Sequence, residues 1–234
     1  MHFYLAGINN QNFLMRDRET GSWWQQVTGR AIAGELAGSS LELMPNDELT
    51  FALWKSEEPQ AHRLVLAPVA GHGDKDGAKD YDKKWEEEVA KYPVPLTFPG
   101  QGLKDRDVIL GVKTGGQARA FPLEKVRGQS PVEDKVAGIP IALVTGPDGQ
   151  SVRIFRSQWN GLDVELYRDT QSEGQSDGKN PEWRLLDSLG NTWNFAGCAT
   201  SGPAAGQCLE KINFLKDYWF DWKNYNPQTT VYSH

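Results

Sequence analysis

Apolar residues in this chain fall mostly in short runs bounded by turn-forming residues, which is the pattern of β-strands. Residues 13–17 and 23–27 are two such runs, and the tight turn at residues 19–22 predicts that they pair as a hairpin. Gly146-Pro147-Asp148-Gly149 is a strong turn signal between two later runs. Strands are predicted at residues 2–6, 13–17, 23–27, 63–67, 108–112, 117–121, 139–144, 152–155 and 162–167.

One segment has the spacing of an amphipathic helix instead. Tyr81, Trp85, Val89 and Tyr92 lie at i, i+4, i+8 and i+11, which places all four on one face of a helix over residues 80–92. An Asp at its first position can cap this helix, and the proline that follows its last position stops it.

Two shorter segments also have helical features. Asn46 can cap a short helix that ends at Leu53 or Trp54, and a strand over the same residues is the alternative. Residues 122–126 fit a single helical turn. The chain is therefore predicted to be mainly β with one or two short helices.

Two distant parts of the chain repeat the same pattern. In residues 17–29 and again in residues 187–197, an Asp precedes a Gly, and a Trp follows that Gly by three positions. From Gly29 onward the two copies run without a gap at an offset of 168, with 11 identities in 32 positions. Matches that stay in register over this length indicate an internal duplication.

The duplication predicts three parts. Residues 1–70 form a first, partial repeat unit, residues 71–104 form a linker with the 80–92 helix, and residues 105–234 form a second, complete unit. Roughly 55 residues precede the repeated pattern in the second unit, and the first unit has no counterpart for them. We therefore expect the first unit to be truncated on its N-terminal side. Either the chain is the C-terminal part of a longer product, or a second chain covers the gap through dimerisation.

Composition narrows the range of partners. A net charge of -6 argues against nucleic acid or an anionic membrane as the partner. No apolar run approaches the ~20 residues that a membrane-spanning helix needs. Neither a basic stretch nor a cleavage site follows Met1, so no signal peptide is visible, and the sequence taken alone indicates the cytoplasm.

The cysteines and histidines form no recognisable metal site. Cys198 and Cys208 have C-x9-C spacing with no His nearby, so the alternatives are two buried thiols or a cross-strand disulfide with Cα atoms roughly 4.4–6.8 Å apart. Residues 73–82 resemble a calcium loop but lack its first and last carboxylates, so a solvated linker is the simpler interpretation. No metal or cofactor is predicted.

The best candidate for a ligand site is the hairpin of the first copy, at Arg16, Asp17, Arg18, Glu19, Trp24 and Gln25. Asp17 and Trp24 recur in the second copy as Asp187 and Trp193, which indicates that the hairpin geometry requires them. The other four residues have no counterpart there, so they are freer to serve a ligand. A solvated hairpin face is the alternative and the commoner role of such charges.

Two motifs resemble the signatures of a prokaryotic domain family of unknown function, DUF3179. They are D-R-E-T-G-S-W-W-Q-Q-V-T-G-R-A-I-A-G-E-L-A-G at residues 17–38, and G-V-K-T-G-G-Q-A-R-A-F-P-L at residues 111–123 followed by V-E-D-K-V-A-G-I-P. The resemblance implies export or lipid anchoring and brings no established activity. Many members carry a Cys-Pro-x-Cys-like segment where this chain has Thr145-Gly146-Pro147-Asp148, so a metal or redox role of that segment does not carry over.

Two classes of function remain. The first is a non-catalytic, extracytoplasmic module that binds a small molecule, a glycan or a protein through exposed Trp and Tyr side chains, and the nine Trp residues favour it. The second is an enzyme in which Asp17 and Glu19, together with Arg18, carry out acid–base chemistry. A catalytic carboxyl of that kind should lie partly buried in a cleft with a raised pKa, which separates the two classes.

Overall fold

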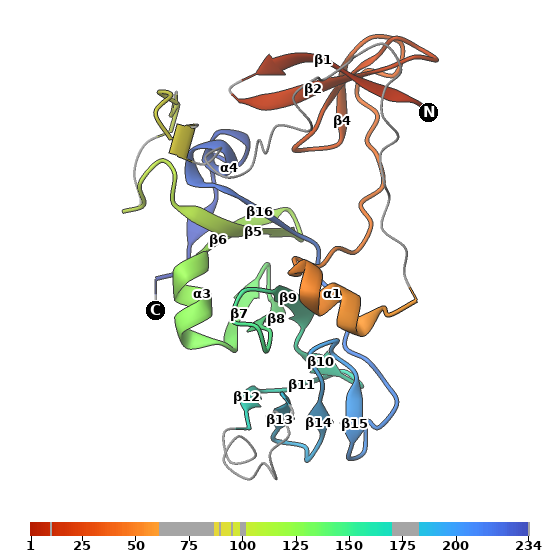
Figure 1. Ribbon diagram of the computed structural model, residues 1–234, viewed down its shortest axis with the longest axis vertical. Helices are drawn as coiled ribbons and strands as arrows, with labels where there is room; N and C mark the ends of the chain where they lie inside the picture. Colours follow the sequence, from red (N-terminus) through yellow and green to blue (C-terminus); the bar gives the residue numbers. More distant parts are fainter. Residues whose placement is uncertain are drawn as a thin grey trace, which may run out of the picture.

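The computed structural model describes residues 1–9, 11–60, 87–88, 90–94, 96–98, 102–169 and 183–233. Within these residues the protein is mainly β, as predicted, with five small sheets and three short helices (Figure 1). The strand predicted at residues 63–67 and most of the helix predicted at residues 80–92 lie outside the described ranges. Of the helices that the structure describes, none combines the length and the apolar character needed to cross a bilayer.

The N-terminal meander is a four-stranded antiparallel sheet whose strands follow chain order. It consists of β1 (Phe3–Asn9), β2 (Asn12–Asp17), β3 (Trp23–Gln25) and β4 (Arg30–Ala33). Met15 lies opposite Trp24, and Arg16 lies opposite Trp23. The hairpin predicted from the turn at residues 19–22 is therefore confirmed.

The C-terminal meander has the same strand order. It consists of β12 (Leu166–Arg168), β13 (Leu185–Asp187), β14 (Thr192–Trp193) and β15 (Ala199–Ser201). The single strand predicted over residues 162–167 is wrong, because the chain changes sheets within it. Residues Leu162–Asp163 form β11, which pairs with β10 (Gln158–Trp159), and only the following residues pair with β13.

Two central sheets stack between the meanders and build most of the core. The first has the order β16-β5-β6-β17 and comprises β5 (Val108–Thr114), β6 (Gln117–Pro122), β16 (Phe214–Tyr218) and the parallel strand β17 (Thr230–Val231). The second comprises β7 (Val132–Val136), β8 (Ile139–Thr145) and β9 (Val152–Arg156).

Burial on both faces explains why β8 is continuously apolar. Ile141 and Leu143 enter the cluster shared with β5 and β6, whereas Ala142 and Val144 enter the cluster shared with the C-terminal meander. A strand that packs on both sides needs apolar residues at every position and not at alternate ones.

The three helices are α1 (Phe51–Glu57), α3 (Leu123–Gln129) and α4 (Trp219–Tyr225). The prediction placed the first helix too early, because Thr50 caps α1 by accepting a hydrogen bond from Leu53 N at 3.2 Å. Asn46 does not cap a helix. Its side-chain amide donates to Phe214 O and accepts from Phe214 N, as the backbone of a neighbouring strand would.

Helix α4 was not predicted from the sequence. Five of its seven residues are buried, and Trp219 and Trp222 pack against Ile109 and Ala120 of the first central sheet. A helix that is buried to this extent shows no clear division into an apolar and a polar face along the sequence. The layers therefore run from α4 through the two central sheets to the C-terminal meander, with the N-terminal meander at the opposite end of the molecule (Figure 1).

Local hydrogen bonds recur at the offset of 168. Ala31 N donates to Ser39 O at 2.9 Å, and Ala199 N donates to Gln207 O at 2.8 Å. Helices α1 and α4 also occupy positions related by this offset. The matching geometry agrees with the repeated sequence pattern, and a duplication as its origin stays a prediction, as does the division of the chain at residues 70 and 105.

Candidate functional site

The predicted hairpin site is built around a buried carboxylate. Asp17 is fully buried and accepts hydrogen bonds from Trp24 Nε1 at 2.8 Å and from Thr20 N at 2.6 Å. Burial of the carboxyl would raise its pKa, but these hydrogen bonds outweigh that effect and lower the pKa to about 2. Asp17 is therefore ionised and fully engaged in holding the turn.

The C-terminal meander has a similar arrangement. Asp187 is buried and accepts from Trp193 Nε1 at 2.9 Å and from Asn191 N at 2.9 Å, and burial is again outweighed, so its pKa is lowered. Asp17 and Asp187 accept corresponding hydrogen bonds in the two meanders, so holding the turn is sufficient to explain why a carboxylate occurs at each position. The recurrence of the Asp and the Trp in the sequence correctly indicated this structural role.

The other hairpin candidates mostly serve local contacts. Glu19 Oε1 lies 2.6 Å from His2 Nδ1, and hydrogen bonds from the backbone and ring of His2 lower the pKa of Glu19 to about 2. Arg16 donates from Nε to Gly21 O at 2.8 Å and stacks over Trp23. Gln25 accepts from Thr28 Oγ1 at 2.8 Å, and Arg18 is exposed on the turn. Both carboxyl pKa values shift in the direction opposite to that of a catalytic acid.

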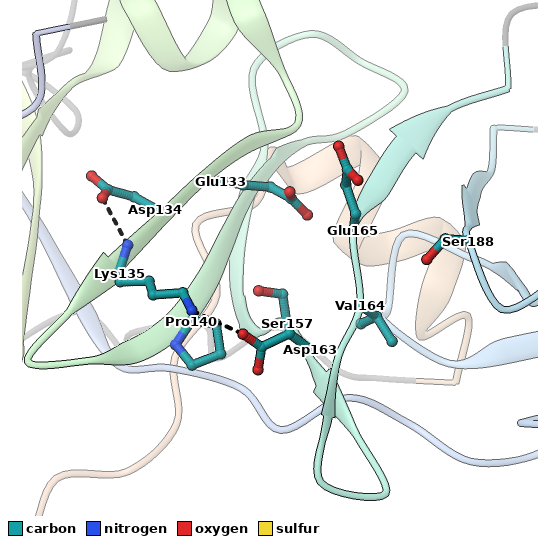
Figure 2. A pocket seen from close by; sticks show the side chains of 9 residues that line it. All are labelled: Glu133, Asp134, Lys135, Pro140, Ser157, Asp163, Val164, Glu165 and Ser188. Atoms are coloured by element: carbon teal, nitrogen blue, oxygen red, sulfur yellow. Dashed lines mark hydrogen bonds and ion pairs between the residues drawn. The ribbon is translucent and has the colours of Figure 1, made fainter.

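An acidic cleft of about 530 Å³ lies elsewhere, between the second central sheet and the C-terminal meander (Figure 2). Carboxylates from three elements meet there: β7 contributes two, β11 contributes one and the residue before β12 contributes one. These residues are Glu133, Asp134, Asp163 and Glu165. The sequence analysis did not predict this cleft, because the residues that line it come from separate elements and form no sequence motif.

Two of the four carboxylates in this acidic cleft are neutralised. Asp134 Oδ2 lies 2.6 Å from Arg119 Nε, and Asp163 Oδ2 lies 2.9 Å from Lys135 Nζ. Burial raises the pKa of Glu133, and the nearby charge of Glu165 raises it further against a 2.7 Å hydrogen bond from Leu166 N. Negative charge therefore remains uncompensated around Glu133 and its neighbour.

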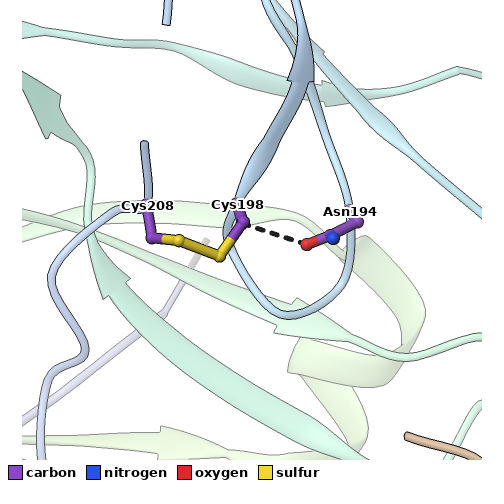
Figure 3. Close-up of a disulfide and its surroundings, with 3 residues drawn as sticks. All are labelled: Asn194, Cys198 and Cys208. Carbon is purple, nitrogen blue, oxygen red and sulfur yellow. Dashed lines mark hydrogen bonds between the residues drawn. A yellow bond between two sulfur atoms is a disulfide. The ribbon is translucent and has the colours of Figure 1, made fainter. Parts of the chain in front are cut away.

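The two cysteines form a disulfide across an antiparallel bridge (Figure 3). The Cα atoms of Cys198 and Cys208 are 3.9 Å apart, closer than the range expected from the sequence. Hydrogen bonds flank the two residues without joining them, and a pair of this type brings the strands nearest together. The corresponding bridge beside the N-terminal meander joins Arg30 and Ser40, so the bridge forms there without a disulfide.

The apolar faces of the two meanders differ in what covers them. In the C-terminal meander Leu166, Trp183 and Leu185 pack against Ala142, Val144 and Phe155 of the second central sheet. In the N-terminal meander, every second side chain of β1 and β2 points to the equivalent face, and these side chains lie opposite one another across the two strands. We call this surface the N-terminal apolar face; it consists of Phe3, Leu5, Ile8 and Phe13.

The N-terminal apolar face is exposed to solvent. Phe3 is 37% exposed where its equivalent Leu166 is 3% exposed, and Phe13 is 45% exposed where Trp183 is 8% exposed. Helix α4 binds the opposite side of the same sheet, since Asp221 and Tyr225 hydrogen bond to Asn12 and Gln25 respectively. Among the residues that the structure describes, none forms a layer over the part of this sheet face made by Phe3, Leu5, Ile8 and Phe13.

Tryptophan does not form the exposed surface that the sequence suggested. Of the Trp residues that the structure describes, none is among the exposed large apolar side chains, and Trp24, Trp193, Trp219 and Trp222 are buried. The exposed aromatic side chains are Phe and Tyr instead. Most of the described Trp residues therefore contribute to packing.

A carboxyl pair lies where α4 meets the N-terminal meander. Asp217 precedes the helix and hydrogen bonds to Asp221 one turn later. Burial and the neighbouring carboxyl raise the pKa of Asp217 to about 8, and burial also raises the pKa of Asp221. The sequence analysis missed this pair, because two acidic residues around a short aromatic segment carry no recognisable motif.

Comparison with known proteins gives one similarity. The family described as "Protein of unknown function (DUF3179)" matches residues 6–229 of the chain. Neither the curated proteins nor the solved structures contain a match. The family match agrees with the resemblance carried by the motifs at residues 17–38 and 111–123.

Proposed function

The chain belongs to the DUF3179 family of proteins of unknown function, and from that premise we propose that it is a non-catalytic, extracytoplasmic interaction module. Its N-terminal apolar face binds the same face of a second copy of the chain. The supporting observation is the contrast between the two meanders, in which equivalent positions are covered in one and exposed in the other.

The covered meander indicates what kind of layer fits the exposed one. Its apolar face packs on a β-sheet of the same chain, through the small side chains Ala142 and Val144 and the ring of Phe155. A second apolar sheet face is the natural partner for such a surface, because aligned sheets interdigitate their side chains. Each copy of the chain carries one such face, which the described residues leave exposed.

Charge favours a second copy over a strongly charged partner. Residues 1–44 contain three arginines and four carboxylates, so this region is close to neutral although the whole chain carries a net charge of -6. Two such regions can approach each other with little repulsion. A contact between identical faces is two-fold symmetric, which is the commonest arrangement among homodimers.

Location outside the cytoplasm is supported by the disulfide. Cystine bridges persist in oxidising compartments and are rare in the cytosol. Cys198 and Cys208 are bridged, and the resemblance to the family points to the same location. The enzyme alternative built on Asp17, Arg18 and Glu19 has less support, since both carboxyls have lowered pKa values and are engaged in local hydrogen bonds.

Sedimentation velocity over a range of micromolar concentrations tests the dimer. We expect the wild-type chain to form dimers, and Ile8→Glu and Phe13→Glu to sediment as monomers because each places a charge in the contact. Phe51→Glu is the matched control: Phe51 is 62% exposed on α1, outside the N-terminal apolar face, so this variant should still dimerise.

Circular dichroism of the three variants should match the wild type, since exposed substitutions usually change stability by less than about 0.5 kcal/mol. A wild-type chain that stays monomeric at every concentration would contradict the proposal. So would a control variant that disrupts the dimer as strongly as the two variants within the face.

A further inference from the structure

The acidic cleft is a second feature that the interaction module does not use. Its walls come from β7, from the start of β8, and from residues on either side of β11, so it depends on the packing of the second central sheet against the C-terminal meander. A volume of about 530 Å³ is in the range of small-molecule sites. The cleft therefore has room for a ligand of several heavy atoms.

The hydroxyl of Ser157 points to a ligand independently of the acidic charge. Ser157 is only 4% exposed, yet within the described parts of the chain its side chain makes no hydrogen bond. Figure 2 shows this hydroxyl turned into the cleft, between Glu133 and Asp163. The rest of Ser157 is buried and its hydroxyl oxygen is accessible from the cleft, so this oxygen is placed to hydrogen bond to a polar group of a ligand there.

The charges around the cleft indicate whether its ligand is positively or negatively charged. Arg119 and Lys135 neutralise Asp134 and Asp163, which leaves Glu133 and Glu165 facing the same space without a cationic partner in the described residues. Two like charges in a concave site repel each other and are relieved by a cation. The cleft is therefore complementary to a positively charged ligand.

We propose that this cleft binds a primary ammonium group carried on a short aliphatic stem. The ammonium has three N–H donors, which match the carboxylates of Glu133 and Glu165 and the hydroxyl of Ser157. The stem lies along Pro140 and Val164, the apolar residues of the lining. A bare metal ion fits less well, because no group of three metal-ligating side chains occurs among the residues that the structure describes.

Isothermal titration calorimetry with the full chain tests the site. The probes are cadaverine, as a free diamine, and an N-terminally acetylated lysine amide, as the side chain of a protein partner. We expect binding of at least one probe at millimolar concentration, weakened by salt. Binding of cadaverine alone would identify a free amine as the ligand, and binding of the lysine amide alone would identify a lysine side chain. The lysine amide acetylated at Nε has lost its charge and should not bind.

Three variants assign the contacts. Glu133→Gln and Glu165→Gln should each weaken binding about tenfold, the loss of one charge-assisted hydrogen bond. Lys135→Gln should strengthen binding, because it frees Asp163 and removes a competing cation. Glu124→Gln is the matched control, since Glu124 is exposed on α3, outside the lining of this cleft, and loses the same charge.

Three results would overturn the proposal. They are the absence of binding by both amines, equal binding of the uncharged lysine derivative, and equal loss of affinity in the Glu124 control. Calcium chloride is titrated alone as well, and tighter binding of calcium than of either amine would identify a metal site instead. Amide chemical shifts of residues 133–135 and 163–165 should move on addition of the bound probe, and in the Glu133→Gln variant the same change should need about tenfold more probe.

Discussion

The two meanders share strand order, a buried Asp–Trp hydrogen bond and a matching antiparallel bridge, yet they sit in different surroundings. The C-terminal meander lies under the second central sheet, and its apolar face is part of the core. The N-terminal meander turns the equivalent face to solvent. Similar local structure therefore persists whether or not another layer covers it, because hydrogen bonds within the turns hold the hairpins.

The helices that contact the two meanders differ in a corresponding way. Leu53 of helix α1 and Leu49, just before the helix, pack against the core cluster of the C-terminal meander. The positions 168 residues later hold Asp217 and Asp221, where α4 approaches the N-terminal meander. One junction is thus apolar and the other ionisable, so we expect the contact between α4 and the N-terminal meander to depend on pH.

The largest effect is expected from Asp187→Ala. Asp187 is buried and accepts hydrogen bonds from Leu189 N, from Asn191 and from Trp193 Nε1, so its removal leaves several buried donors unsatisfied. We expect a loss of about 3–5 kcal/mol in the free energy of unfolding, measured by urea denaturation. Asp17→Ala should instead remove amide-exchange protection from residues 1–44 and retain it in residues 105–169. Equal global destabilisation by both variants would show that the two meanders unfold as one unit.

A matched pair of glycines probes the covering layer itself. Gly197 has φ +81°, and a Cβ there would collide with the ring of Phe155, so Gly197→Ala should cost about 3 kcal/mol from strain and overpacking together. Gly29 has φ +63°, but its Cβ would lie 3.5 Å from Leu41 Cβ, so Gly29→Ala should cost only about 1 kcal/mol of backbone strain. Thermal unfolding of the two variants checks the difference, and similar losses would mean that both faces are equally packed.

The disulfide tests whether the bridge depends on its covalent link. Cys198 and Cys208 close a loop with a sequence separation of 10, so replacing both by Ser should lower stability by roughly 2–3 kcal/mol through the entropy of the unfolded chain. The backbone bridge should remain, because Arg30 and Ser40 form the same bridge without cysteine. Cross-strand nuclear Overhauser contacts between the two replaced positions would show this, and their loss would contradict it.

The smallest effect concerns the ionisable junction and depends on pH. The folded state keeps Asp217 protonated up to about pH 8, whereas the unfolded chain releases that proton near its ordinary pKa of 3.8. Wild-type stability should therefore fall as pH rises between these values, and Asp217→Asn should remove that part of the slope. We expect the variant to gain about 2 kcal/mol over the wild type by pH 8, after allowance for solvent screening at this junction. Parallel stability curves for the two proteins would exclude a raised pKa.

Local features of the fold could be predicted from the sequence alone. Short apolar runs and turn residues located β2, β5, β6, β8 and β9, because strand and turn preferences act over a few neighbouring residues. The recurrence of Asp17 and Trp24 as Asp187 and Trp193 indicated an Asp–Trp pair in each hairpin, and the structure has that hydrogen bond in both. The C-x9-C spacing left two alternatives, of which the structure has the disulfide.

Only the tertiary structure decided how the layers cover one another. The aromatic run of α4 becomes a helix because Trp219 and Trp222 find a sheet to pack on, and burial of that kind outweighs weak local preferences. Contacts between elements that are distant in the chain form the acidic cleft and bury the carboxyl pair of Asp217 and Asp221. The N-terminal apolar face is exposed because the described residues make no such contact with it. Burial, charge proximity and pKa depend on those distances through space, and the order of residues along the chain does not contain them.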